Sequence, residues 1–468
     1  MTIRLLAGGL AIAAAGVLGY GIYQIIPMGE PLARSEVVGE LIGPALASYS
    51  RVAIQRYGER QLLTGQLLVT SKDIEGLARA PVLDTQVPAL KKRLQTQRLR
   101  LAQTGAVTAL RQGHDDLALT MLQTGRSTTD TRNLIYGGRG TGVFELLGSI
   151  SGDTGVTVIG TPEGETLYLV TSTLRQAGDG DQPAAWDTLR SDDLGTTWTY
   201  DPDVTLGPPQ QHTAFLTPQL AVALEKHETG MRLLHSCDGG RRWAATLLKE
   251  QVWPDSAAFE RGFAVSAERD RSVYGEEQLG YGWSLYPLDE RRAVGWSWRT
   301  RVRPQGTEKA EVIETRRFEV QFQEGASPAF RITPDVPPVP VQDTRALLAR
   351  DQPVFEAAGN AIYELDKAAM EWIRRSESPA VRGARSWIAQ AWFGPNAWVI
   401  KTYADHMFSG NTYTTTYFYS RDEGRTWNPF QLSHDQESGL LGLDQTGDAL
   451  LSLGERGGKT VIRRYLLD

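Results

Sequence analysis

The chain opens on a long stretch without charge. Residues 5–28 contain no charged side chain and follow directly after Arg4. A helix of that length crosses the roughly 30 Å hydrocarbon core of a bilayer, whereas the apolar core of a secretory signal is only about 7–15 residues long. Because Arg4 lies on the short side, the pattern predicts an anchor within residues 1–28, with the remaining chain outside the cytoplasm. A cleaved signal peptide is the alternative.

The next segment, residues 29–132, contains no Trp. Ser35–Arg56 could be helical, and so could Val87–Ala102, where Val87, Leu90 and Leu94 recur at steps of three and four. The basic side chains on the other face of this second stretch are interpreted as a solvated helix face, although an acidic lipid or partner is the alternative. Other parts of the segment can equally be strands. We therefore expect a mixed α/β membrane-proximal segment.

From residue 133 to 468 the pattern is typical of β structure. Short apolar or alternating runs, such as Thr166–Thr171 and Ala397–Tyr403, are separated by turns rich in Gly, Asp, Asn and Pro. Two further runs, Trp283–Leu288 and Ala293–Trp298, flank a turn at residues 289–292 and predict a hairpin. All 12 Trp lie beyond residue 180. The sequence therefore predicts a mainly β domain over 133–468.

An internal repeat divides this domain. Three segments share the pattern S-x-D-x-G-x-[T/R]-W, and a fourth, from Ser151 to Val158, matches except at its last position. The aspartates at positions 153, 193, 238 and 422 are 40, 45 and 184 residues apart, and 184 is four steps of 46. Such a period predicts a propeller of four-stranded blades. The residues of the three full copies are Ser191, Asp193, Gly195, Trp198, Ser236, Asp238, Gly240, Trp243, Ser420, Asp422, Gly424 and Trp427.

The residue types of the motif suit a tight turn. Ser and Asp oxygens can accept hydrogen bonds from backbone N–H groups across the turn. Gly adopts the left-handed conformation at no steric cost, and the Trp can pack into apolar surface on the following strand. We therefore predict a structural role for these residues.

This repeat resembles the Asp-box, or bacterial neuraminidase repeat, of the sialidase-like β-propeller superfamily, over about residues 135–468. The spacing of the boxes and of the predicted hairpins fits a six- or seven-bladed propeller, and the resemblance implies that the boxes lie at its periphery, away from the central site. An exo-sialidase would also need three arginines, a Tyr–Glu pair and an Asp. The family's Arg-Ile-Pro marker has only an imperfect counterpart at Arg331–Pro334, which follows the second full box instead of preceding the first. No residue is carried over as catalytic.

One strand carries a row of arginines. Arg299, Arg301 and Arg303 alternate with apolar or neutral residues, so that a regular strand places all three on one face. The functional interpretation is an anion-binding stripe for a carboxylate, a phosphate or an acidic protein surface. The alternative is a solvated outer strand with a charged face.

Composition excludes several classes of function. A net charge of −6 and a pI near 5.7 argue against a nucleic-acid-binding protein. Cys237 is the single cysteine, so the chain forms no internal disulfide and no Cys-based zinc site, and the six His lack metal-ligand spacing. We expect no metal and no cofactor.

The motifs of the fold are intact, but no residue is recognisable as one that an exo-sialidase needs for catalysis. This combination favours a non-catalytic function. The main hypothesis is a membrane-anchored, periplasmic or extracellular recognition or assembly module for a protein or glycan partner. The alternative is an enzyme, a diverged exo-sialidase-type glycoside hydrolase.

Overall fold

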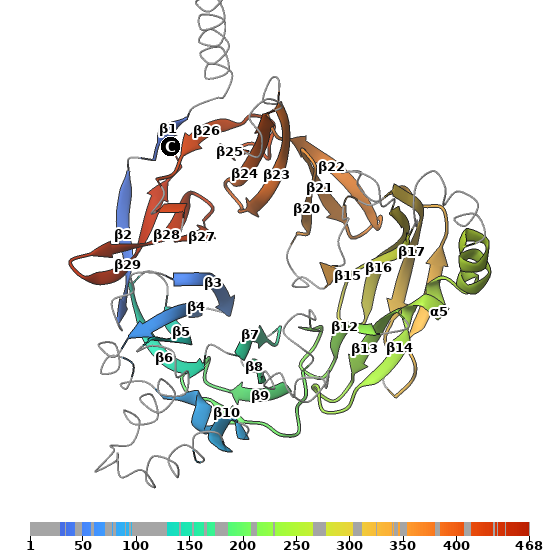
Figure 1. Ribbon diagram of the computed structural model, residues 1–468, viewed down its shortest axis with the longest axis horizontal. Helices are drawn as coiled ribbons and strands as arrows, with labels where there is room; N and C mark the ends of the chain where they lie inside the picture. Colours follow the sequence, from blue (N-terminus) through green and yellow to red (C-terminus); the bar gives the residue numbers. More distant parts are fainter. Residues whose placement is uncertain are drawn as a thin grey trace, which may run out of the picture. The chain divides into compact units, whose positions relative to one another are not determined.

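The computed structural model describes most of residues 29–95 and of 129–467 (Figure 1). Residues 1–28 and 96–128 lie outside the described residues, as do shorter internal stretches, the longest being 174–185, 265–277 and 303–310. The predicted anchor at residues 5–28 therefore lies outside them. Within the described ranges, no helix is both long and apolar enough to cross a bilayer.

The chain divides into two compact units. The larger comprises Val38–Pro353 with Glu455–Val461, and the smaller comprises Met1–Val37, Val354–Gly454 and Ile462–Asp468. In both units the described residues lie mostly in strands. The mainly β class predicted from the sequence is confirmed.

The larger unit contains four groups of antiparallel strands, in which each strand pairs with the next along the chain. β2 lies parallel to β6 at the edge of the first group, and β19 lies parallel to β15 in the fourth. The elements, in groups, are β2 (Ser35–Ile42), β3 (Tyr49–Tyr57), β4 (Arg60–Thr70), η2 (Leu83–Thr85), β5 (Thr129–Arg139) and β6 (Gly142–Ser151); β7 (Thr154–Gly160), β8 (Leu167–Thr173), β9 (Trp186–Ser191) and β10 (Thr199–Tyr200); β11 (Ala214–Phe215), β12 (Ala221–His227), β13 (Gly230–Ser236), β14 (Ala244–Leu247) and α5 (Leu248–Val252); and β15 (Gln278–Pro287), β16 (Arg292–Val302), β17 (Glu311–Gln321), β18 (Ala329–Thr333) and β19 (Arg345–Ala346).

The smaller unit follows the same rule of pairing between successive strands. β1 adds a short parallel strand to β26. The elements are β1 (Glu30–Pro31), β20 (Phe355–Ala358), β21 (Ala361–Asp366) and β22 (Glu371–Glu377); β23 (Ala384–Phe393), β24 (Trp398–His406), β25 (Tyr413–Ser420) and β26 (Asn428–Gln431); and β27 (Leu440–Leu443), β28 (Ala449–Arg456) and β29 (Lys459–Leu466), the last two strands being shared with the larger unit.

Groups of three or four consecutive antiparallel strands are the usual topology of propeller blades. A propeller fold is therefore supported, while the number of blades, six or seven, stays a prediction. In the smaller unit the start of β2 lies beside β29. The amide of Leu466 donates to the carbonyl of Arg34 at 3.1 Å, and Arg464 pairs with Glu36 at 2.9 Å.

The helix predicted over Ser35–Arg56 is wrong, because β2 and β3 occupy most of that stretch. Its Val and Ile side chains favour extended backbone, and β2 gains backbone partners from β6.

In the second predicted helix, Val87 and Leu90 are buried while Lys91 and Lys92 are exposed, in agreement with the amphipathic pattern. The segment boundary at residue 132 falls inside β5, which pairs with β4 along its whole length.

Each motif Trp packs into a core that it shares with strands of the preceding group. Trp198 joins Leu62 and Ile135 from β4 and β5, and Trp243 packs against a cluster with Tyr168 from β8. Trp427 packs likewise against a cluster of the smaller unit that contains residues of β20 and β21. The Trp of each motif therefore holds its own hairpin against the group before it.

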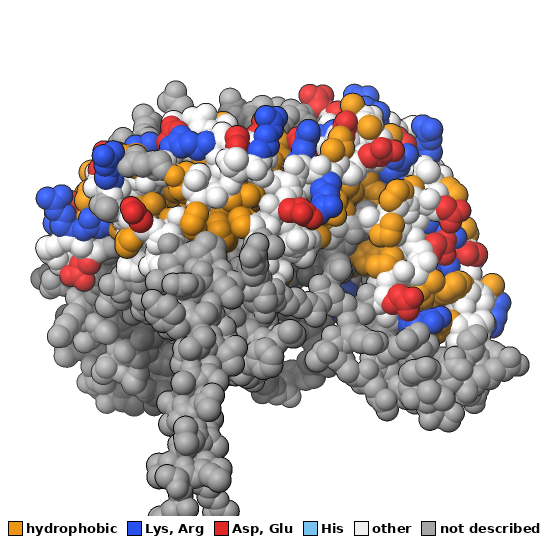
Figure 2. All heavy atoms as spheres, turned by 90° about the horizontal axis from the view of Figure 1, so that it is seen from above, with side chains coloured by type: hydrophobic (Ala, Val, Ile, Leu, Met, Phe, Trp, Pro, Cys, Tyr) orange, Lys and Arg blue, Asp and Glu red, His pale blue; other side chains and the backbone are white. Residues whose placement is uncertain are grey.

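On the face drawn in Figure 2, acidic and basic side chains are interspersed over the described surface, with hydrophobic side chains between them. This mixture agrees with a modest net charge of −6. No long-range attraction for one sign of charge is expected from such a surface.

Candidate functional site

The three motif turns share one pattern of hydrogen bonds. In the first, the Ser191 hydroxyl accepts from the Gly195 amide at 2.7 Å and donates to the Asp193 carboxylate at 2.8 Å. That carboxylate accepts from the amide and the hydroxyl of Thr197, at 2.8 and 2.7 Å. The same contacts recur around Asp238 and Asp422 within 0.1 Å, with Arg242 and Thr426 as the donors.

These contacts occupy the motif carboxylates within their own turns. Donors from Thr426 and Ser420 lower the pKa of Asp422 to about 2, and those from Arg242 lower the pKa of Asp238. The motif glycines lie in the left-handed region, with φ of +84° at Gly195, +90° at Gly240 and +82° at Gly424. Such turns suit a structural role, which stays a prediction. The fourth, partial turn at residues 152–153 lies outside the described residues.

A pocket of about 620 Å³ lies beside the second motif turn. Its described lining includes His235, Cys237 and the one carboxylate Asp238. Since both oxygens of Asp238 accept hydrogen bonds within the turn, the described lining of this pocket presents no unoccupied carboxylate for acid–base chemistry.

The arginine row does not form the stripe that simple alternation predicts. Arg299 is completely buried, Arg301 is half-buried with its guanidinium 5.6 Å from the Phe263 ring, and Arg303 lies outside the described residues. The pairing of β16 with β17 shifts register between Arg299 and Thr300. Because of this irregularity and of the ring of Phe259, 4.0 Å away, Arg299 is not a solvent-facing residue.

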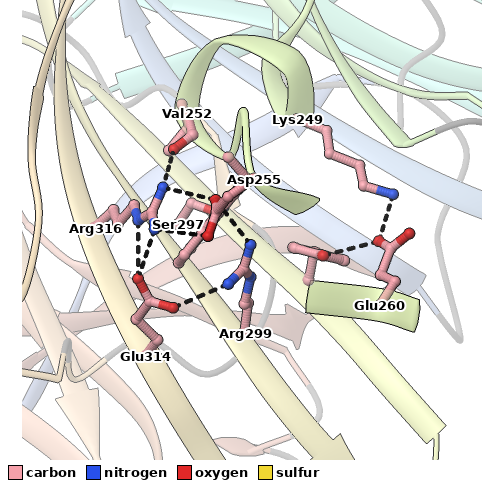
Figure 3. Close-up of polar contacts among 10 residues, drawn as sticks. Lys249, Val252, Asp255, Glu260, Ser297, Arg299, Glu314 and Arg316 are labelled. Atoms are coloured by element: carbon pink, nitrogen blue, oxygen red, sulfur yellow. Dashed lines mark hydrogen bonds and ion pairs between the residues drawn. The ribbon is translucent and has the colours of Figure 1, made fainter. Parts of the chain in front are cut away.

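Arg299 instead belongs to a cluster of charged groups in the larger unit (Figure 3). Tyr281, Arg299 and Glu314 are opposite one another in register across β15, β16 and β17. Arg316 and Ser297 come from the same sheet, and the remaining members come from α5 and from the helical residues 256–264 with the turn before them. The sheet thus fixes one side of the cluster and a separate segment supplies the other.

Two arginines of the cluster are held by the same two carboxylates. Arg299 pairs with Glu314 at 3.0 Å and with Asp255 at 3.2 Å. Arg316 pairs with Glu314 at 2.9 Å and with Asp255 at 3.2 Å, and it also donates to the carbonyl of Val252 at 3.0 Å. Figure 3 shows both guanidinium groups pointing toward these oxygens.

The ring of Trp253 contacts both of these cations. Its centroid is 4.0 Å from the guanidinium of Arg299 and 4.1 Å from that of Arg316. Its N–H donates to the hydroxyl of Ser297 at 2.7 Å. Cation–π contacts at such distances are favourable, and more so when the cation is desolvated. Burial would raise the pKa of Asp255, but the charges of Arg299 and Arg316 outweigh it and lower that pKa.

A third carboxylate, Glu260, lies at the more open side of the cluster. It accepts a hydrogen bond from the Tyr281 hydroxyl at 2.8 Å and pairs with Lys249 at 2.5 Å, and 36% of its side chain is exposed. Burial acts to raise its pKa, yet the bonds from Lys249 and Tyr281 outweigh this and lower it. Burial and the neighbouring Glu260 raise the pKa of Tyr281, which stays a hydrogen-bond donor. Glu260 is thus an accessible, ionised carboxylate held by two donors.

The smaller unit contains a similar arrangement. Glu437 accepts from Lys401 at 2.6 Å and from the Tyr417 hydroxyl at 2.9 Å. Lys401 and Tyr417 are opposite each other in β24 and β25. Burial first, and then Glu437, raise the pKa of Tyr417, whose ring lies in the core. The two clusters have matching chemistry, and either can therefore serve as a control for the other.

Sequence reasoning missed Asp255, Glu260 and Trp253. The strand partners of Trp253 and Asp255 in β16 and β17 lie 44 residues or more away, the strand partner of Glu260 in β15 lies 21 residues away, and no motif marks any of the three. One signal was available: Trp253 follows directly after an amphipathic stretch in which Leu248 and Val252 are both buried.

No protein-family model matches the chain, and no curated protein matches it. Among solved structures, it is similar to an α-L-arabinofuranosidase of Fusarium graminearum, with 10% identity and a TM-score of 0.34, covering 83% of this chain and 98% of that one. An α-L-arabinanase of Penicillium chrysogenum gives 10% and 0.33, covering 93% and 99%. The polysaccharide lyase Uly1 gives 10% and 0.35, covering 79% and 76%.

This comparison corrects the main functional hypothesis. The similar structures are glycoside hydrolases and a lyase, and this finding goes against the expectation of a non-catalytic recognition or assembly module and favours its alternative, a glycoside hydrolase. At these TM-scores the similarity identifies neither a substrate nor a site. Membership of the Asp-box superfamily stays a prediction.

Proposed function

We propose that this protein is a glycoside hydrolase and that Glu260 is its reacting carboxylate. The observation that supports this assignment is the pair of hydrogen bonds that hold Glu260, from Tyr281 at 2.8 Å and from Lys249 at 2.5 Å, with part of the carboxylate still open to solvent. Most glycoside hydrolases depend on an Asp or Glu carboxylate at the scissile bond. An enzymatic function also agrees with the alternative hypothesis drawn from the sequence, that of a diverged glycoside hydrolase.

The chemistry follows from the charge state of Glu260. A carboxylate that attacks the anomeric carbon, or that takes a proton from water, must be ionised. Its lowered pKa keeps Glu260 in that form at neutral pH. Tyr281 and Lys249 fix the orientation of the carboxylate, so that little conformational entropy is lost in the transition state.

The test is hydrolysis by the full chain of a panel of aryl glycosides, including an α-L-arabinofuranoside and a sialoside. Aryl leaving groups depart with little need for a proton donor, so the assay reports on Glu260 itself. Glu260→Gln should lower the rate at least about 100-fold. Glu437→Gln, the same change in the matched cluster of the smaller unit, should leave the rate within about twofold.

Two results would contradict the assignment. One is no release of the aryl group from any glycoside by the folded protein. The other is a rate that falls with Glu437→Gln and not with Glu260→Gln, which would move the site to the smaller unit.

The predicted anchor would hold such an enzyme at the outer side of a membrane, and membrane fractionation of the full chain tests that part separately.

A further inference from the structure

The cationic side of this site is already neutralised by the chain itself. Arg299 is completely buried, and its two terminal nitrogens are taken by Glu314 and Asp255. Its guanidinium also lies 4.0 Å from the ring centroids of both Trp253 and Phe259. An incoming ligand could reach Arg299 only after that packing opened.

The guanidinium nitrogens of Arg316 are likewise all engaged by groups of the chain itself. Its Nε donates to Glu314 at 2.9 Å, one terminal nitrogen donates to Val252 and Asp255, and the other contacts Asp255 and Glu314. Only 15% of its side chain is exposed. Neither arginine therefore keeps the bidentate face that recognition of a substrate carboxylate requires.

The groups that remain open to a ligand are acidic. Asp255 is 49% exposed and Glu260 is 36% exposed, whereas Lys249 is 23% exposed and pairs with Glu260. Three cations and three carboxylates make up the described part of the cluster, so their charges balance, and the two most exposed of these six side chains are the carboxylates Asp255 and Glu260. A sugar that bears a carboxylate meets like charge there, while a neutral sugar finds carboxylate oxygens that accept its hydroxyl protons.

We infer that the site takes uncharged glycosides and rejects sialic and uronic acid residues, and that Asp255 is the residue that sets this preference. This inference rests on the proposed function for the location of the site. Asp255 acts by occupying Arg299 and Arg316, which would otherwise attract an anionic substrate.

Binding tests the preference without turnover. The full chain carrying Glu260→Gln is titrated by calorimetry with arabinobiose and with N-acetylneuraminic acid. We expect the neutral sugar to bind at least tenfold more tightly. Adding Asp255→Asn should reduce this ratio at least tenfold, because both arginines lose one anionic partner. Adding Asp289→Asn, which removes a carboxylate paired with Arg292 outside the cluster, should leave the ratio unchanged.

The outcomes separate this inference from the proposed function. Equal or tighter binding of N-acetylneuraminic acid overturns the inference, and so does failure of the Glu260→Gln protein to bind either sugar. An Asp255→Asn protein that folds, as judged by its melting curve, yet keeps the original ratio removes Asp255 from the explanation. If that variant does not fold, the ratio in the Glu260→Gln protein decides alone. A wild-type protein that hydrolyses nothing refutes the proposed function whatever the binding ratio is.

Discussion

Arg299 and Glu314 stand directly opposite each other in β16 and β17 and form an ion pair at 3.0 Å in which the arginine has no exposed surface. A cation in that position cannot be hydrated, so its stability depends on the carboxylates that contact it. The pair explains why a strand that resembles a basic surface in the sequence forms part of the interior.

Glu314→Gln should destabilise the larger unit by about 3 kcal/mol, because a buried arginine is left with one charged partner instead of two. Urea unfolding followed by tryptophan fluorescence measures this change. The control is Glu319→Gln, which removes a carboxylate 3.7 Å from the exposed Arg331 and should cost no more than about 0.5 kcal/mol. Similar midpoints for both variants would mean that Arg299 tolerates the loss of its partner.

Gly424→Ala should destabilise the smaller unit more than Gly359→Ala. Both glycines have positive φ, +82° and +62°, so each substitution should cost about 1–2 kcal/mol of backbone strain. A methyl group at position 424 would also lie 2.5 Å from the Cβ of Ser376, whereas position 359 is open. Overpacking adds about 1–3 kcal/mol to the first variant alone. Equal unfolding midpoints would show that the turn can relax around the methyl group.

The third motif turn should contribute a pH-dependent part of the stability. Donors from Thr426 and Ser420 hold the pKa of Asp422 at about 2, below its ordinary value of 3.8. Because the folded state has the lower pKa, this contribution is complete above about pH 4 and is lost as the pH falls toward 2. Melting temperatures between pH 7 and 2.5 should therefore fall less steeply for Asp422→Asn than for the unchanged protein. The exposed residue Asp203, changed to Asn, serves as the control and should leave the slope unaltered.

Lys249→Ala should move the acidic limb of the pH–rate profile to higher pH. Lys249 lowers the pKa of Glu260 in the folded protein, so its removal raises that pKa and Glu260 becomes protonated sooner as the pH falls. The profile of kcat/KM for an aryl glycoside measures this shift. Lys401→Ala, in the second cluster, should leave the profile in place, and a shift with that variant instead would assign the rate to Glu437.

The sequence was informative where a fold feature is local. The hairpin around residues 289–292 is confirmed, with β15 ending at Pro287 and β16 beginning at Arg292, because alternation and a turn aspartate lie within a few residues of each other. The spacing of Ser, Asp and Gly predicted hydrogen bonds that close within five residues. Such features depend on neighbours that a short window contains.

The candidate site could not be predicted because its geometry is not local. Arg299 meets Asp255 across 44 residues and Arg316 meets the same carboxylate across 61. Whether the Arg299 side chain is buried or exposed also depends on the register shift next to it, which the alternating pattern does not indicate. For Ser35–Arg56, pairing partners elsewhere in the chain decided between helix and strand.

The contact between Arg464 and Glu36 joins residues that are 428 positions apart. During synthesis, at about 5–20 residues per second, the Glu36 side of this contact leaves the ribosome roughly 20–90 seconds before its partner exists. The early strand edge must therefore remain unpaired for that time and is exposed to pairing with other chains. Production at lower temperature, or with a chaperone that shields strand edges, should raise the yield of correctly folded protein.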